Sequence, residues 1–498
     1  MAKHIEKATY ESQAGEIEFD TAKVMEGGMK RVYFTRDKTG VVAFFKEPSW
    51  AYANKARLTR VVENFNPSAV GKSHSDYWRN LFCWPSHIIN HSEFGLGLLL
   101  PVYPQDFFFK KGRLAGKEKD GGWYNGKNPT TNRLLRYDLI DASERGNLAT
   151  YLAALSRVAR AVQKMHASGL AHSDLSERNV LIDPVSGKAI IIDVDALVVT
   201  GLYPPDVLGT PGFIAPEVMA TKKLDFKDPN RKHASAETDK HALGVLIYRY
   251  LLERGPLDGR RYIKGASPDE ENEALYGAKA LYSEHRSDPA NRPKESYLAA
   301  SILGKTIDDL FHKTFVDGLL RPTVRPTASN WADALAGAFD SLLACSNTAC
   351  THKWFVLTNA QSPVCPYCKT RYQGRFSKMN LSHDDPKHTT LMGEVVLNGF
   401  RHGTGTRLYQ YHTRKGAERG PGQDNAVLAE VVFLDQPSPT FYLKNVALPS
   451  MQVRMPSTGN SNFQPLPVGQ KLQLVTGLEV KFGADPEALT GRIESFTH

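Results

Sequence analysis

The sequence has no long apolar run and few cysteines. No stretch approaches the roughly 18–20 apolar residues that span a bilayer, and the N-terminus lacks a signal-peptide pattern. We therefore expect a cytoplasmic chain without a membrane segment. Only 5 of the 498 residues are cysteine, and a disulfide is not expected in a chain without an export signal. Internal repeats and long low-complexity tracts are also missing.

Charge of one sign is not concentrated anywhere in the chain. The net charge is +9 at pH 7, but the lysines and arginines are scattered and no nucleic-acid-binding motif accompanies them. We therefore expect no nucleic-acid partner. The length and the hydrophobic content of 41% predict three domains with real cores.

The most informative pattern runs from His172 to Glu217. Asp174, which can accept a hydroxyl proton, lies five residues before Asn179, which can hold a metal. Asp193 follows fourteen residues later, behind three isoleucines, and 209–217 reads Gly-Thr-Pro-Gly-Phe-Ile-Ala-Pro-Glu. This layout resembles the catalytic loop, the metal-binding strand end and the activation-segment end of bacterial protein kinases of the eukaryotic type.

The resemblance implies a bilobal α+β fold with ATP between the lobes. Asp174 would act as the base, and Asn179 and Asp193 would hold magnesium. Arg178 would supply the charge at the transferring phosphate, because Ser176 replaces the usual lysine.

Upstream, residues 26–33 resemble the glycine loop that covers the phosphates in this family. Met25 and Lys30 stand where the first and last glycines would be. Contacts with the nucleotide are expected from Gly27, Gly28, Met29 and Val32 in this loop, and from Leu100 and Val102 in the hinge.

An apolar strand over 41–45 ends in Lys46, which we expect to neutralise the α and β phosphates of ATP. A surface lysine is the alternative. The helix carboxylate that would pair with Lys46 is Glu63. An ordinary solvated glutamate on the face of that helix is nearly as good an interpretation of Glu63.

Several further expectations follow from the resemblance. Asp239 should hold the catalytic-loop backbone, Arg325 should pair with Glu217, and Thr327 should cap a helix. We interpret the basic, glycine-rich segment 107–124 as a flexible surface loop in preference to a docking element. Ser173 replaces the arginine that receives an activation-loop phosphate, and Thr200 is the only threonine or serine between 195 and 209, so activation by loop phosphorylation is not expected.

A second chemical signal lies at Cys345, Cys350, Cys365 and Cys368. The spacing, C-x4-C and then C-x2-C after fourteen residues, is typical of two turns that hold one zinc ion. A closed set of four thiolates leaves no open position, which predicts a structural zinc ribbon. Ordinary reduced thiols are the alternative.

From 389 onward, short strands alternate with turns and predict an all-β sandwich. Its last half is similar to forkhead-associated domains, although the phosphothreonine-binding signatures are not visible, so a plain interaction domain is favoured over a phosphopeptide reader. The expected domains are a kinase over 18–343, with lobes at 18–102 and 103–343, the zinc ribbon over 344–378 and the sandwich over 388–498.

The expected function is a magnesium- and ATP-dependent protein kinase, acting on serine or threonine more than on tyrosine. Trp84-Pro85 and the cysteine segment resemble kinases of tellurium-resistance and stress gene clusters. That resemblance implies protein substrates, with a von Willebrand-type protein and a protein phosphatase as partners. The alternative is a catalytically weak scaffold that presents the sandwich to partners, which the altered glycine loop favours.

Overall fold

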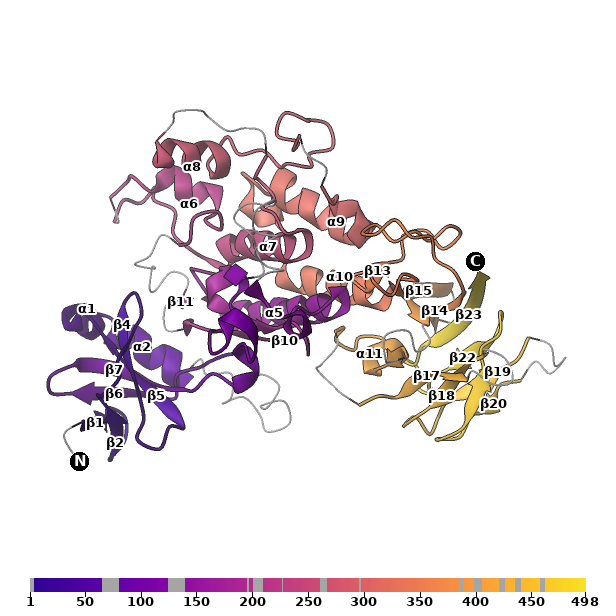
Figure 1. The fold of residues 1–498 in the computed structure, drawn as a ribbon, viewed down its shortest axis with the longest axis horizontal. Helices are drawn as coiled ribbons and strands as arrows, with labels where there is room; N and C mark the ends of the chain where they lie inside the picture. The colour runs from indigo at the N-terminus through magenta and orange to yellow at the C-terminus, as the bar shows by residue number, and fades with distance from the viewer. Residues whose placement is uncertain are drawn as a thin grey trace.

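The computed structural model describes residues 4–64, 80–123, 139–194, 197–199, 209–225, 227–259, 267–294, 297–385, 388–397, 405–420, 426–434, 440–456 and 462–498. An N-terminal sheet, a helical middle region and a C-terminal β region follow one another along the long axis (Figure 1). Within the described residues, no helix combines the length and the apolar character needed to cross a bilayer.

The N-terminal region is built on a seven-stranded sheet in the order β2-β1-β6-β7-β5-β4-β3, with all neighbours antiparallel. Its strands are β1 (Ile5–Tyr10), β2 (Glu16–Asp20), β3 (Met25–Glu26), β4 (Lys30–Phe34), β5 (Gly40–Phe45), β6 (His87–His91) and β7 (Gly95–Pro101). One face packs against the short helices α1 (Pro48–Ala53) and α2 (Lys55–Thr59), which continue into a π-helical turn over Arg60–Asn64.

The boundary that we placed at residue 18 lies inside this sheet. The hairpin of β1 and β2 joins its edge because Thr9 and Tyr10 pair with Asn90 and Ile89 of β6. Ala8 and Phe19 are fully buried in the core on that side. The sequence pattern suggested no reason to add the hairpin, since its outward positions are charged.

The middle region contains six α-helices within the described residues. They are α5 (Leu148–Ala167), α6 (Pro216–Thr221), α7 (Ala236–Leu252), α8 (Pro268–Tyr276), α9 (Lys305–His312) and α10 (Ala328–Asp340). Most of them pack around one large apolar core, while the buried side chains of α6 form a small separate cluster. The short strands here are β8 (Leu170–Ala171), β9 (Val180–Asp183), β10 (Lys188–Ile191) and β11 (Val198–Val199).

Helix α5 shows how the sequence builds this core. Asn147 caps its first turn by accepting hydrogen bonds from the backbone N–H groups of Ala149 and Thr150. Buried apolar residues then recur every three or four positions, the spacing that gives a helix one face toward the core. The helix packs against α10 and α7, and its C-terminal end leads into β8.

The segment after the hinge is not a flexible surface loop where the structure describes it, up to Trp123. Lys119 is buried, and its Nζ lies 3.0 Å from Asp183 Oδ1 and 3.4 Å from Glu144 Oε1. Phe107 and Phe109 are buried as well. The basic composition misled the prediction because a buried lysine with two carboxylate partners has the same sequence appearance as a solvated one.

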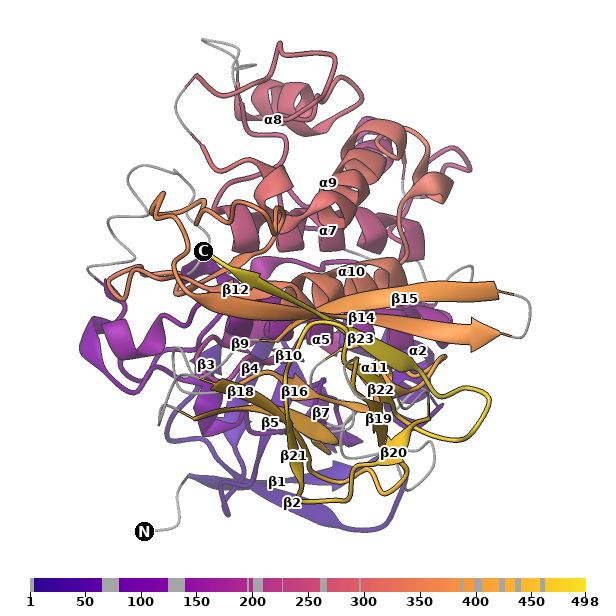
Figure 2. The ribbon, with the colours of Figure 1, turned by 90° about the vertical axis from the view of Figure 1, so that its right-hand side faces the viewer.

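The C-terminal region consists of two antiparallel sheets that share one apolar core. Figure 2 shows the long β14–β15 hairpin beside α10. The sheets comprise β15 (His388–Leu397), β14 (Arg375–Asp385), β23 (Thr490–Thr497), β22 (Glu479–Lys481), β19 (Gln452–Arg454) and β20 (Gln464–Pro465), and then β16 (Arg407–Leu408), β17 (Ala429–Leu434), β18 (Thr440–Asn445) and β21 (Lys471–Gln473), with the short helix α11 (Gln410–Thr413).

The C-terminal region is fixed to the helical region by buried polar contacts. Asp340, at the end of α10, accepts a hydrogen bond from the Tyr411 hydroxyl at 2.9 Å and lies 3.0 Å from His412 Nε2. The buried Arg160 of α5 donates to the backbone oxygen of Arg419 at 3.0 Å. These contacts hold the two regions against each other.

The cysteine segment joins both regions. β12 (Leu342–Ala344) pairs with β13 (Trp354–Val356), and this hairpin packs partly into the helical core. The thiol side of the segment shares its own small core with Phe376 of β14 and Val396 of β15. The predicted limits at 378 and 388 therefore fall within one continuous packing unit, because β14 already begins at Arg375.

Candidate active site

The loop after β8 places Asp174 at the mouth of a cleft. The backbone of this loop is fixed to α7, because the Asp239 carboxylate accepts a hydrogen bond from the His172 N–H at 2.7 Å. The predicted role of Asp239 is confirmed. Ser173 adopts φ 66°, a left-handed conformation that turns the chain sharply before the aspartate.

The Asp174 carboxylate is oriented on both sides. Thr210 donates to Oδ1 through its backbone N–H and its hydroxyl, each at 2.8 Å. The Asn179 amide donates to Oδ2 at 3.1 Å and to the Asp174 backbone oxygen at 2.7 Å. A carboxylate fixed in this way can accept a proton from a hydroxyl group brought to it.

Asp193 follows β10 with φ 61°, and its side chain is 46% exposed. Its Oδ1 lies 2.7 Å from the Nζ of Lys30. Because the Asn179 amide nitrogen is used by Asp174, its Oδ1 remains as the atom suited to a cation. Asp174, Asn179 and Asp193 all line one cavity of about 640 Å³.

That cavity lies between the N-terminal sheet and the helical region, and its volume falls within the range of about 300–1,000 Å³ for small-molecule sites. The structure brings six predicted nucleotide contacts to its lining: Gly27, Gly28, Met29, Val32, Leu100 and Val102. Apolar side chains from β4, β5 and the hinge form its walls, as a flat aromatic ring requires.

Three predicted residues are not brought to this lining. The Nζ of Lys46 lies 3.4 Å from Glu26 Oε2, and Lys46 is not among the described residues around the cavity. Glu63 is exposed on the π-helical turn. Arg178 is exposed and lies near Asp120. Burial raises the pKa of the Asp120 carboxyl, and the Arg178 charge offsets part of that rise.

Four charged residues of the cavity lining were missed from the sequence: Glu26, Lys30, Arg57 and Glu118. Arg57, on α2, is 2% exposed and lies with its guanidinium carbon 5.2 Å from the Trp50 ring centroid. Burial raises the pKa of the Glu118 carboxyl, and the nearby Asp120 charge raises it further. Lys30 carried a visible signal, since it replaces a glycine of the loop.

The substrate side of the cleft is braced by a buried ion pair. Arg325 donates to both carboxylate oxygens of Glu217, at 2.7 and 2.8 Å, and its side chain has no exposed surface. Thr327 caps α10 by accepting from the Asn330 N–H. Both predictions are confirmed. Thr200 lies outside the described residues.

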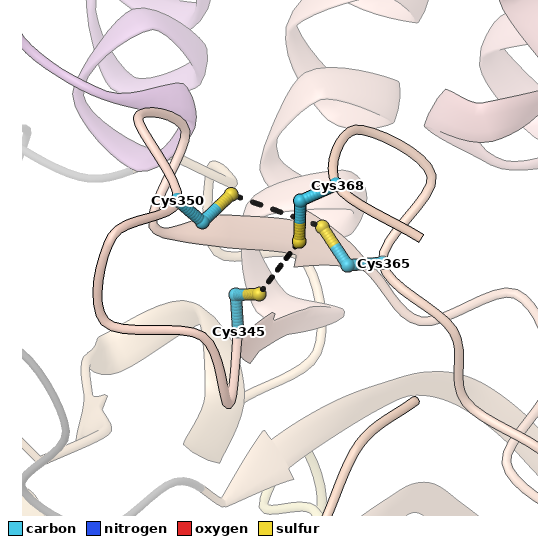
Figure 3. Close-up of side chains that lie close together, drawn as sticks. All are labelled: Cys345, Cys350, Cys365 and Cys368. Atoms are coloured by element: carbon cyan, nitrogen blue, oxygen red, sulfur yellow. Dashed lines mark hydrogen bonds between the residues drawn. The ribbon is translucent and has the colours of Figure 1, made fainter. Parts of the chain in front are cut away.

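The four predicted cysteines meet in one cluster (Figure 3). Sγ of Cys345 lies 3.5 Å from that of Cys368, and Sγ of Cys350 lies 4.0 Å from that of Cys365. All four sulfur atoms lie within 4.8 Å of one another. Thiolates around one tetrahedral zinc ion are about 3.8 Å apart, which follows from Zn–S bonds of about 2.3 Å. The set present fits that geometry.

Comparison with known proteins adds independent evidence. Residues 135–331 match the family model of the protein kinase domain. The chain is 27% identical over 141 residues to the serine/threonine-protein kinase PknD of Chlamydia felis, covering 24% of this chain and 14% of that protein. It is 32% identical over 119 residues to the DNA damage-responsive serine/threonine-protein kinase RqkA of Deinococcus radiodurans, covering 23% of this chain and 16% of that protein.

These alignments span less than a fifth of either relative. The matched residues include Asp174, Asn179 and Asp193, which the structure gathers at one cavity. The chain therefore carries an enzyme domain, a protein kinase domain similar to those of serine/threonine-protein kinases.

Proposed function

We propose that this chain is an active kinase that transfers the γ-phosphate of ATP to a serine or threonine hydroxyl of a protein. The observation that carries the proposal is the convergence of Asp174, Asn179 and Asp193 on one nucleotide-sized cavity. The printed names of the relatives support hydroxyl groups of serine and threonine as acceptors.

Asp174 orients the attacking hydroxyl and accepts its proton. Thr210 and Asn179 keep its carboxylate at one angle, so little reorganisation is needed as the hydroxyl approaches. Asn179 and Asp193 offer oxygen atoms, the ligands preferred by Mg²⁺. When bound with ATP, magnesium supplies charge neutralisation for the phosphates. Val32 and Leu100, in the walls of the cavity, would contact the adenine ring of ATP.

The rival proposal is a scaffold that binds nucleotide poorly. The position of Lys46 outside the cavity lining favours it. The oriented carboxylate of Asp174 opposes it, because a scaffold has no need of a fixed proton acceptor.

One assay separates the two. The wild-type chain is incubated with labelled ATP and magnesium, with a general protein substrate, beside Asp174→Ala and the exposed control Asp288→Ala. A kinase gives transfer in the wild type and control and almost none in Asp174→Ala, with nucleotide binding nearly unchanged. Equal transfer by wild type and Asp174→Ala, or none by the wild type, contradicts the proposal.

We further propose that Cys345, Cys350, Cys365 and Cys368 hold one structural zinc ion, in a cytoplasmic setting where thiols stay reduced. The sulfur spacing supports this. The two-sheet C-terminal region is proposed as an interaction domain for protein partners, of the forkhead-associated-like type. A von Willebrand-type protein and a phosphatase from a stress gene cluster are the candidates to test by co-purification.

A further inference from the structure

We propose that Lys30, in the loop that covers the cavity, is the lysine that neutralises the nucleotide phosphates, and that Lys46 does not have this role. The inference deepens the proposed function and rests on it, since it names the group that binds the phosphates in the same cavity.

The face of β5 that looks into the cavity carries no lysine. Side chains of a strand alternate between its two faces. Val41 and Ala43 line the cavity, and Phe45, next on that face, is buried with Leu58 of α2. Lys46 follows with the opposite parity, beyond the end of the strand. Its ammonium group pairs with Glu26, which lines the cavity although Lys46 itself does not.

The cavity face of the neighbouring strand does carry a lysine. Lys30, Val32 and Phe34 of β4 alternate on that face, and all three line the cavity. Lys30 pairs across the ladder with Phe45, so it reaches the end of the cavity where the β5 lysine was expected. The replacement of a loop glycine by lysine therefore moves the positive charge to the next strand.

The electrostatics of Lys30 fit this role. Its side chain is only 16% exposed, and its Nζ lies 2.7 Å from Asp193 Oδ1. Asp193 is the carboxylate proposed to hold magnesium, so the ammonium group lies where metal-bound phosphates would enter. In such a partly buried site, a charge pair is stronger than in water.

Helix α2 supports the same assignment. At the cavity it presents Arg57, a cation, where a carboxylate would be needed to position a lysine from β5. Glu63, the predicted partner, is exposed. Lys30 needs no helix carboxylate, because Asp193 positions it.

The test compares Lys30→Met with the matched variant Lys46→Met. MgATP binding is measured by titration calorimetry, and kcat and KM are measured in the transfer assay. We expect Lys30→Met to lower kcat/KM about 100-fold, the effect of losing one charge-stabilising donor. Lys46→Met should stay within about twofold of the wild type. Lys30→Arg should recover part of the loss, because it keeps the charge.

Failure of the Lys30 assignment can be told apart from failure of the proposed kinase activity. If the wild type binds MgATP without transferring phosphate, the binding arm still decides between the two lysines. A larger loss in Lys46→Met than in Lys30→Met overturns the inference, as does a Lys30→Met variant that is folded and binds MgATP like the wild type. Thermal melting verifies folding, and Lys30→Arg replaces any Lys30→Met variant that does not fold.

Discussion

The two lobes of the kinase domain differ in how closely they follow the family pattern. The family model covers 135–331 and thus begins after the N-terminal sheet. In the C-terminal lobe, the contacts of Asp239 and Arg325 are those that the motifs predicted. In the N-terminal lobe, the lysine that lines the cavity is Lys30 of β4, whereas the motif predicted Lys46 after β5.

The physical reason lies in what each lobe has to do. Proton acceptance and metal binding need particular atoms at particular angles, and a short loop with fixed spacing provides them. Phosphate neutralisation needs a positive charge within reach, and a long lysine side chain can supply it from either of two neighbouring strands. The first task tolerates few sequences, while the second tolerates several.

After Asp174→Ala, the largest effect is expected from Asp193→Ala in the C-terminal lobe. The change removes the proposed metal ligand and the partner of Lys30 together. Transfer should fall by a factor of about 10³, comparable to the loss of a major electrostatic contact. Initial rates at several magnesium concentrations check this, with Asp288→Ala as the control. Activity within tenfold of the wild type would mean that the metal is held elsewhere.

Arg325→Ala should destabilise the same lobe without touching the cavity. Removing one partner of a buried ion pair leaves the Glu217 charge uncompensated, at a cost of about 3–5 kcal/mol. Urea unfolding of the wild type, Arg325→Ala and the exposed control Arg321→Ala measures the difference. A change below about 1 kcal/mol, the value for surface pairs, would show that the pair contributes little.

Cys368→Ser should act locally. If four thiolates hold one zinc ion, the variant should lose most of its bound metal and become sensitive to protease between 344 and 378. The cavity residues lie outside this segment, so MgATP binding should remain. Elemental analysis and limited proteolysis under reducing conditions provide the readouts. A metal-free wild-type chain that resists protease would leave the cysteines as ordinary thiols.

The smallest effect is expected from Glu63→Gln in the N-terminal lobe. Glu63 is exposed and lies outside the cavity lining, so kcat/KM should stay within about twofold of the wild type, the range of surface substitutions. A loss of tenfold or more would restore the predicted helix partner and weaken the contrast between the lobes. Steady-state kinetics are sufficient to decide.

The sequence predicted the C-terminal lobe well because its signals are local. Asp174 and Asn179 are separated by a fixed spacing within one loop, and the fold leaves them little freedom. Lys46 shows the limit of this reasoning. An apolar run predicts a strand, but a shift of one residue moves every side chain to the other face. Spacing along the run could not decide whether the side chain of Phe45 or that of Lys46 lies on the cavity face of the strand. The pairing of β4 with β5 decides this.

The buried Lys119 shows a second limit. Its partners Glu144 and Asp183 lie 25 and 64 residues away in sequence, so no local pattern connects them. Burial of a charge depends on partners contributed by the whole fold. The four cysteines were easier to predict as a cluster, since cysteines at that spacing serve few purposes other than metal binding.

The most direct test of the account is a crystal structure of the chain with magnesium and a non-hydrolysable ATP analogue. We predict the nucleotide in the cavity between the lobes, Asn179 and Asp193 at the metal, and the Lys30 ammonium group within hydrogen-bonding distance of a phosphate oxygen. Lys46 should remain with Glu26. A nucleotide whose phosphates contact Lys46 and not Lys30, or a cavity that stays empty at saturating nucleotide, would contradict the account.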